Sequence, residues 1–220
     1  MALISIRRRG QLAEVLTLAP ERYDPRRELQ PLTKRTTLLT QVVRIVRRTV
    51  QPSDKLGRCL VLDTSDAREG IIAYRKQPVD GGEIGSAKKI IESKQVIISR
   101  LRPYLRQVAL VDPWMQLPHS TVLICSTEFF VLGSVDDRSI AFLIPFLLTE
   151  QVQTVLAASQ EGGHHPRFED SALLNLPIPE AVLRRRDEVS ANVEECVHLF
   201  RQSESRMAQM VRADASAFDH

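Results

Sequence analysis

The chain has 220 residues, of which 43% are hydrophobic and 26% are charged, with a formal net charge of +3. This composition argues against a disordered chain, and the length allows one globular domain, or one domain with a helical appendage. The charge is unevenly distributed: residues 1–112 carry 22 basic and 12 acidic side chains, a balance of +10, whereas residues 113–220 carry 8 and 15, a balance of −7.

Residues 1–35 are expected to form an irregular N-terminal arm, because the stretch ERYDPRRELQP contains two prolines and an Asp-Pro turn signal. Residues 36–49 follow with the sequence TTLLTQVVRIVRRT. Apolar residues recur in it at helical spacing and arginines occupy the other side, so this segment is predicted to be a short amphipathic helix.

Short β-rich runs separated by turn residues begin after Gly57. In chain order they are CLVLDTS, GIIAY, KQVIISRL, QVALVD, STVLICS and EFFVLGS. Runs of this length and spacing are typical of strands in a mixed or mostly antiparallel sheet that is partly barrel-like. Helical patterns are missing between them, which argues against a doubly wound parallel sheet.

Helical periodicity returns in the second half of the chain. Residues 139–159 are predicted to be helical, and NLPIP at 175–179 to be extended because of its prolines. Residues 180–213 are predicted to form one helix about 50 Å long. It is longer than one domain core needs, which favours pairing with a second copy or a partner subunit; the alternative is that it folds back over the sheet. The positions proposed for pairing are Val189, Val193, Cys196, Phe200 and Met207.

These elements give the predicted fold class. It is α/β (α+β), with a mixed, partly barrel-like β-sheet domain, flanking helices and a long C-terminal helix. The domain is expected to cover residues 1–178, including the arm, and the helix residues 179–220. The three cysteines lie far apart and no apolar run is long enough to span a bilayer, so we expect a reduced, cytoplasmic compartment and no membrane segment.

Motifs for catalysis, metals or cofactors are absent from the sequence. His164 and His165 are adjacent, so their side chains diverge and do not bind one metal together. No HExxH, CxxC or GxSxG motif occurs, and GGEIGS at 81–86 lacks the GK[ST] ending of a phosphate loop. We therefore expect a protein that is not an enzyme and that uses no metal or cofactor.

The strongest binding candidate is SRLRPYLR at 99–106. In an extended segment, Arg100, Arg102, Tyr104 and Arg106 would share one face, where guanidinium groups suit phosphates and guanine edges. The alternative is a polar, solvent-facing edge with Leu101 and Leu105 turned to the core. Of the 30 basic residues, 24 are arginine. This bias suits nucleic-acid binding, but a GC-rich genome and ordinary solvent-exposed faces would also explain it.

Four stretches in this order resemble the target recognition domain of a type I restriction-modification specificity subunit. They are KQVIISRLRPYLRQVALVD, TEFFVLGS, LLTEQVQTVLAASQEGGHHPRF and LLNLPIPEAV. ERYDPRR also resembles the arm that precedes such domains. The usual Gly-Asp before the first strand is Ser93-Lys94-Gln95 here. Subunits of this family commonly hold two such domains and two long helices, whereas this chain has room for one of each.

The resemblance implies a module that recognises double-stranded DNA in a restriction or phage-defence system and has no chemistry of its own. Its implied partners are a methyltransferase subunit, with nuclease subunits and a second copy of the chain as further candidates. Positions matched to the family give the candidate DNA-binding residues Lys88, Lys89, Ser99, Arg100, Arg102, Tyr104, Arg106, Gly163, His164, His165 and Arg167. For the HHPR turn, a capped turn without DNA contact is an equal alternative.

Two other functions remain open from the sequence. The first is a protein-interaction adaptor that has kept the fold and lost the DNA contacts. The second is a domain cut from a larger methyltransferase, which is disfavoured because the chain has no NPPY-type motif and no nucleotide-binding glycine loop.

Overall fold

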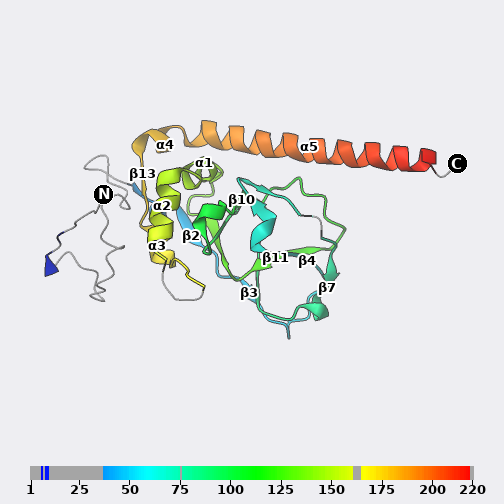
Figure 1. Ribbon diagram of the computed structural model, residues 1–220, viewed down its shortest axis with the longest axis horizontal. Helices are drawn as coiled ribbons and strands as arrows, with labels where there is room; N and C mark the ends of the chain where they lie inside the picture. Colours follow the sequence, from blue (N-terminus) through cyan, green and yellow to red (C-terminus); the bar gives the residue numbers. More distant parts are fainter. Residues whose placement is uncertain (1–5, 7, 10–36, 75, 161–164, 219–220) are drawn as a thin grey trace.

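The computed structural model describes residues 6, 8, 9, 37–74, 76–160 and 165–218, with side chains described as far as Arg212 in the last helix. The expected N-terminal arm, 1–35, therefore lies almost entirely outside the described residues. The fold class is confirmed: mixed sheets are flanked by helices, and a long helix ends the chain (Figure 1). Within the described part the sheets do not close into a barrel.

A four-stranded antiparallel sheet forms the centre of the domain. Its order is β10 (Val108–Leu110), β9 (Val96–Ser99), β12 (Phe129–Ser134) and β2 (Val43–Ile45). Strand β9 is buried on both faces. Val96 and Ile98 point into one apolar cluster and Ile97 into another, because successive side chains of a strand alternate. This explains its unbroken apolar sequence.

A five-stranded sheet packs against the other side of this centre. Its order is β3 (Thr49–Val50), β8 (Lys88–Ile90), β11 (Val122–Ser126), β4 (Arg58–Leu62) and β7 (Val79–Asp80). The β11–β4 pair is parallel and the other pairs are antiparallel, so the predicted mixed sheet is confirmed. Leu60, Leu123 and Cys125 meet Ile97 and Val131 in the apolar layer between the two sheets.

Two short strand pairs complete the β-structure. β1 (Thr37–Leu38) pairs with β13 (Pro177–Ile178), and β5 (Ala67–Arg68) pairs with β6 (Ile71–Ile72). The NLPIP segment is thus extended, as predicted. In the described part of the chain, four single-turn 3-10 helices lie between the strands: η4 (Leu39–Gln41), η5 (Thr64–Asp66), η6 (Gly81–Glu83) and η7 (Pro103–Leu105).

The amphipathic helix predicted for residues 36–49 is wrong. The segment contains β1, η4, β2 and the start of β3. Val43 is buried and Arg44 is exposed, the alternation of a strand. The β-branched residues of VVRIV lose side-chain freedom in a helix and fit the pleated sheet better, and here that preference outweighs the helical spacing.

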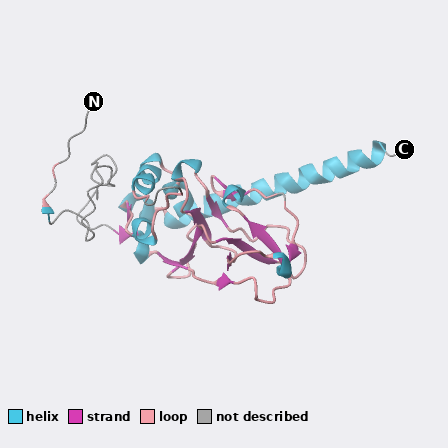
Figure 2. Ribbon diagram, turned by 60° about the horizontal axis from the view of Figure 1, so that its bottom comes forward, coloured by secondary structure: helices cyan, strands magenta, loops and turns pink. Residues whose placement is uncertain are grey.

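Helices cover the free face of the four-stranded sheet (Figures 1 and 2). They are α1 (Leu143–Leu147), α2 (Glu150–Ala158), α3 (Asp170–Leu174), α4 (Glu180–Arg184) and α5 (Arg186–Phe218). The predicted helix at 139–159 is therefore two helices, and Thr149 caps α2 with its side chain. None of the described helices is long and apolar enough to cross a membrane.

The long helix α5 packs on its own domain at first and then extends beyond it (Figure 2). Val189 and Val193 pack against the core under the helix, so these two proposed pairing positions are used within the domain. Cys196 is exposed and Phe200 is half-buried. Met207 is 61% exposed. The alternative of folding back thus holds for the first half of the helix, whereas Met207 lies on the part that extends beyond the domain.

Two buried arginines fix the direction of α5. Near its start, Arg186 donates to both carboxylate oxygens of Asp136 at 2.7 and 2.8 Å and to the Ser139 carbonyl at 3.1 Å. Further along, Arg201 donates to Asp112 at 2.9 Å and to the Ile72 carbonyl at 2.7 Å. The Arg201 side chain is 8% exposed and that of Asp112 is fully buried, so water does not screen this pair.

Candidate nucleic-acid interface

Lys89 is placed by the register of strand β8, where it pairs with Thr49 on one side and Cys125 on the other. Its ammonium donates to the Phe129 carbonyl at 2.5 Å and lies 5.8 Å from the centre of the Phe130 ring. Burial, with the nearby positive charges of Arg100 and Arg47, lowers the pKa of Lys89 from its ordinary value. Lys88, the preceding residue of the strand, donates its ammonium hydrogen bonds to the carbonyl and hydroxyl of Ser86 instead.

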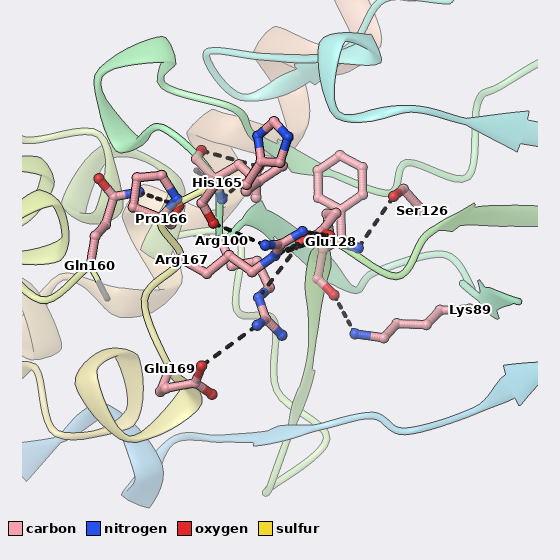
Figure 3. Close-up of polar contacts among 12 residues, drawn as sticks. Lys89, Arg100, Ser126, Glu128, Gln160, His165, Pro166, Arg167 and Glu169 are labelled. Carbon is pink, nitrogen blue, oxygen red and sulfur yellow. Dashed lines mark hydrogen bonds and ion pairs between the residues drawn. The ribbon is translucent and has the colours of Figure 1, made fainter. Parts of the chain in front are cut away.

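Glu128 lies at the turn between β11 and β12 and is the acidic centre of this region (Figure 3). Arg167 binds it with both ends of its guanidinium, Nε to Oε2 at 2.9 Å and Nη2 to Oε1 at 2.6 Å. Hydrogen bonding by Arg167, followed by its charge and that of Arg100, lowers the pKa of Glu128. The carboxylate is therefore ionised and paired near neutral pH.

Arg100 has a looser arrangement beside the same carboxylate. Its Nε lies 3.6 Å from Glu128 Oε2, and its Nη2 lies 3.6 Å from Glu169 Oε1 (Figure 3). Both separations exceed hydrogen-bond length, and the buried Nε atom has no hydrogen-bond partner among the described residues. The guanidinium also lies 5.7 Å from the centre of the Phe130 ring.

The segment 165–169 brings Arg167 and Glu169 to this position through backbone contacts. Phe168 N–H donates to the Arg100 carbonyl at 3.2 Å, and Leu101 and Arg167 form an isolated antiparallel bridge. His165 is exposed, and its carbonyl accepts from Arg167 at 2.9 Å. Gly163 and His164, predicted from the same turn, lie outside the described residues.

The predicted alternation across residues 100–106 is wrong. Residues 103–105 form the single turn η7, and the residues on both sides of it, Arg102 and Arg106, have left-handed backbones with φ of 44° and 53°. Pro103 is buried, whereas Tyr104 is 68% exposed. Pro103 fixes its own φ and disrupts the extended run, so the four side chains do not share one face.

The turn presents its residues in different environments. The Arg102 side chain is exposed and makes no ion pair or hydrogen bond with any described residue. Arg106 binds Glu69, Nε to Oε1, at 2.6 Å. Leu105 is 45% exposed, which corrects the alternative that placed it in the core. Arg102, Tyr104 and Leu105 are the exposed residues of the turn and are called its tip below. The turn itself packs against α2.

Ser99 does not reach the surface. It is 3% exposed, and its hydroxyl bonds both the N–H and the carbonyl of Leu101 at 3.2 Å. This predicted DNA-contact residue therefore shapes the chain before η7. A direct contact with DNA would require the strand end to open.

Sequence reasoning missed the acidic members of the site and Arg47. Arg47 binds Asp170, Nη2 to Oδ2, at 2.5 Å, and Arg48 binds Glu92. The signal for Arg47 was the RIVRR run, which was assigned to a helix. We use the name basic cluster for Lys89, Arg100, Arg167 and Arg47. The first three lie around Glu128, and the charge of Arg47 acts on Lys89. No group of three metal-ligating side chains occurs within the described parts of the chain.

Comparison with known proteins identifies this architecture. No protein-family model and no curated protein matches the chain. Among solved structures, a chain from a study of complex assembly and conformational transition of the type I R-M system is similar, with a TM-score of 0.56 and 26% identity. The HsdS subunit from Thermoanaerobacter tengcongensis is also similar, with a TM-score of 0.53 and 24% identity. Each match covers 82% of this chain.

This is the fold of the target recognition domain in type I specificity subunits. The chain spans 45% of the length of each of these two structures. The basic cluster and the η7 turn thus lie on a target recognition domain fold. The resemblance seen in the sequence is confirmed at the level of the fold.

Proposed function

We propose that this chain is the sequence-specific, double-stranded DNA recognition module of a restriction-modification or related phage-defence system. In this proposal it carries no catalytic step and uses no cofactor. It selects DNA for partner methyltransferase and nuclease subunits in the cytoplasm. The observation that carries the proposal is a basic cluster beside an exposed Arg-Tyr-Leu tip, on a fold shared with type I specificity subunits.

The two parts of the surface suit two tasks in DNA binding. The cations of the basic cluster suit phosphates, which fix the position of a protein on the duplex but carry little sequence information. Arg102 and Tyr104 at the tip of η7 are exposed and are long enough to reach base edges. An arginine fork on guanine is the commonest specific contact of this kind.

A titration of labelled duplex DNA tests this function directly. We expect saturable binding at low salt, with an affinity that falls linearly on a log-log plot as salt rises, by about 0.9 in slope for each phosphate contacted. The measurement is fluorescence anisotropy with a random 24-base-pair duplex between 50 and 300 mM salt. Binding that is absent at low salt would refute the proposal.

The second candidate is a protein-interaction adaptor on the same fold. The observation in its favour is that several arginines are already paired with carboxylates, among them Arg167 with Glu128 and Arg106 with Glu69. An adaptor would show no saturable binding in the duplex titration and would still bind its protein partner. The unpaired Arg102 and the loosely held Arg100 favour DNA binding over this alternative.

The far end of α5 is the proposed docking site for another subunit. Leu199, Met207, Met210 and Val211 lie on one side of the helix and are 54% to 61% exposed. Their spacing of three and four residues near the end is that of an apolar seam. The candidates are a second copy of the chain and a methyltransferase subunit.

Charges placed in this seam are expected to weaken association. We predict that Met207→Glu with Met210→Glu lowers the self-association or methyltransferase binding of the chain at least tenfold, because two carboxylates would have to be buried without partners. Light scattering measures the mass in solution, alone and with the methyltransferase subunit. The control is Ala208→Glu with Gln209→Glu, two exposed positions on the side of the helix away from the seam. Equal association of both variants would contradict the prediction.

A further inference from the structure

Lys89 and Arg100 bring two positive charges to one aromatic ring. The Lys89 ammonium and the Arg100 guanidinium lie 5.8 and 5.7 Å from the centre of Phe130. Neither cation forms a hydrogen bond to a carboxylate of the described residues. The two like charges repel each other, and the Arg100 charge accordingly lowers the pKa of Lys89 alongside burial. An anion that binds both would relieve the repulsion.

The nearest carboxylate is already occupied. Glu128 accepts two short hydrogen bonds from Arg167, and the remaining contact to Arg100 is an ion pair at 3.6 Å. Glu169 holds the other end of Arg100 at the same distance, and its own side chain is 59% exposed. Two long, partly solvated pairs are weak restraints. The Arg100 guanidinium can therefore exchange them for a better acceptor.

The side chain of Arg100 is also ready for such an exchange. Its buried Nε has no hydrogen-bond partner among the described residues, and an unpaired buried donor costs more than a weak bond returns. The backbone of Arg100 is fixed on both sides. Its N–H donates to the backbone carbonyl of Glu128, and its carbonyl accepts from Phe168 N–H. The backbone contacts therefore hold the Arg100 side chain in place, although its Nε–H donates no hydrogen bond to a described residue.

We propose that Arg100 and Lys89 form a site for one phosphate of the DNA backbone, and that Glu128 keeps Arg167 out of this site. This rests on the proposed DNA-binding function and adds the role of each group. Phosphate oxygens can bind the terminal nitrogens of the Arg100 guanidinium, whose side chain is 26% exposed, in place of its two long ion pairs, and the Lys89 ammonium adds a point charge. Glu128 acts as an internal competing anion, which lowers affinity for any duplex and so limits non-specific binding.

Two substitutions of opposite effect test the proposal in the full-length chain. Arg100→Gln is expected to lower the log-log salt slope of duplex binding by about 0.9, the value for one phosphate contact. Glu128→Gln is expected to raise the slope by about the same amount and to tighten binding to random duplex, because Arg167 is then released. Arg185→Gln is the matched control, since Arg185 binds Glu188 at 2.6 Å on α5; its slope should equal that of the wild type.

A second measurement does not depend on DNA. Titration of the isotope-labelled protein with inorganic phosphate should shift the NMR signal of the Arg100 side-chain Nε–H, and the shift should be lost in the Lys89→Gln variant. If duplex binds but the slope is unchanged in Arg100→Gln, the inference fails and the proposed function stands. If no duplex binds, the function fails, and a missing phosphate shift then overturns the site as well.

Discussion

Replacing Asp112 with alanine is expected to lower the free energy of unfolding by about 3–5 kcal/mol, the cost of removing one partner from a buried ion pair. Asp112 is fully buried and accepts from Arg201 Nη2 at 2.9 Å and from Trp114 N–H at 3.1 Å. Without it the Arg201 guanidinium stays buried with only the Ile72 carbonyl and Glu204 as partners. Urea unfolding followed by circular dichroism measures the loss.

Two further variants separate the charge effect from loss of packing. The double replacement of Asp112 with leucine and Arg201 with methionine is expected to recover most of the lost stability, because apolar residues of similar volume often replace a buried pair at little cost. Glu188→Ala breaks the exposed Arg185–Glu188 pair and should leave the urea midpoint nearly unchanged. A midpoint for Asp112→Ala close to that of Glu188→Ala would show that the pair does not hold α5.

Replacing Lys89, Arg100 and Arg102 together with glutamine is expected to remove most of the binding to duplex DNA. These three cations form no hydrogen bond to a carboxylate among the described residues, so each is available to the nucleic acid. In our proposal Lys89 and Arg100 share one phosphate and Arg102 reaches a base edge, so the salt slope of the variant falls by about 0.9. At about 1.5 kcal/mol for each charge-assisted hydrogen bond, the affinity falls on the order of a thousandfold.

The control for this variant carries the same change in charge. Arg138, Arg185 and Arg206 lie on or beside α5, and Arg138 and Arg185 are paired with Asp187 and Glu188. Their triple replacement with glutamine removes three positive charges but none from the basic cluster. We expect a slope close to that of the wild type. If both triple variants lose the same slope, binding follows net charge and the basic cluster has no special role.

The strands and the long helix could be predicted from the sequence because their signals are local. KQVIISRL and EFFVLGS carry the apolar runs VII and FFVL, and both form central strands. The helix predicted for residues 36–49 is wrong because the same valines satisfy both a helical spacing and the alternating spacing of a strand. Only burial against β12 decides between them, and that contact comes from a distant part of the chain.

The candidate site could be predicted only in part, because some of its residues have a local signal and others depend on distant contacts. The sequence predicts Lys89, Arg100 and Arg167 as basic residues at positions matched to the family, and the structure brings them around Glu128. Glu128 itself gave no signal, because its pairing with Arg167 spans 39 positions of the sequence. The left-handed residues Arg102 and Arg106 were also unexpected, since non-glycine residues rarely adopt this conformation.

The contacts that close the domain join its earliest and latest parts, which sets the order of folding during synthesis. Strand β1 pairs with β13, and Arg201 reaches back 129 positions to Ile72. The apolar face under the helices includes Leu176, Ile178 and Val197. A chain still emerging from the ribosome lacks these residues, so this face stays open to water until the last helix is made. Completion of the domain therefore waits for the synthesis of α5 and is dominated by slow long-range contacts.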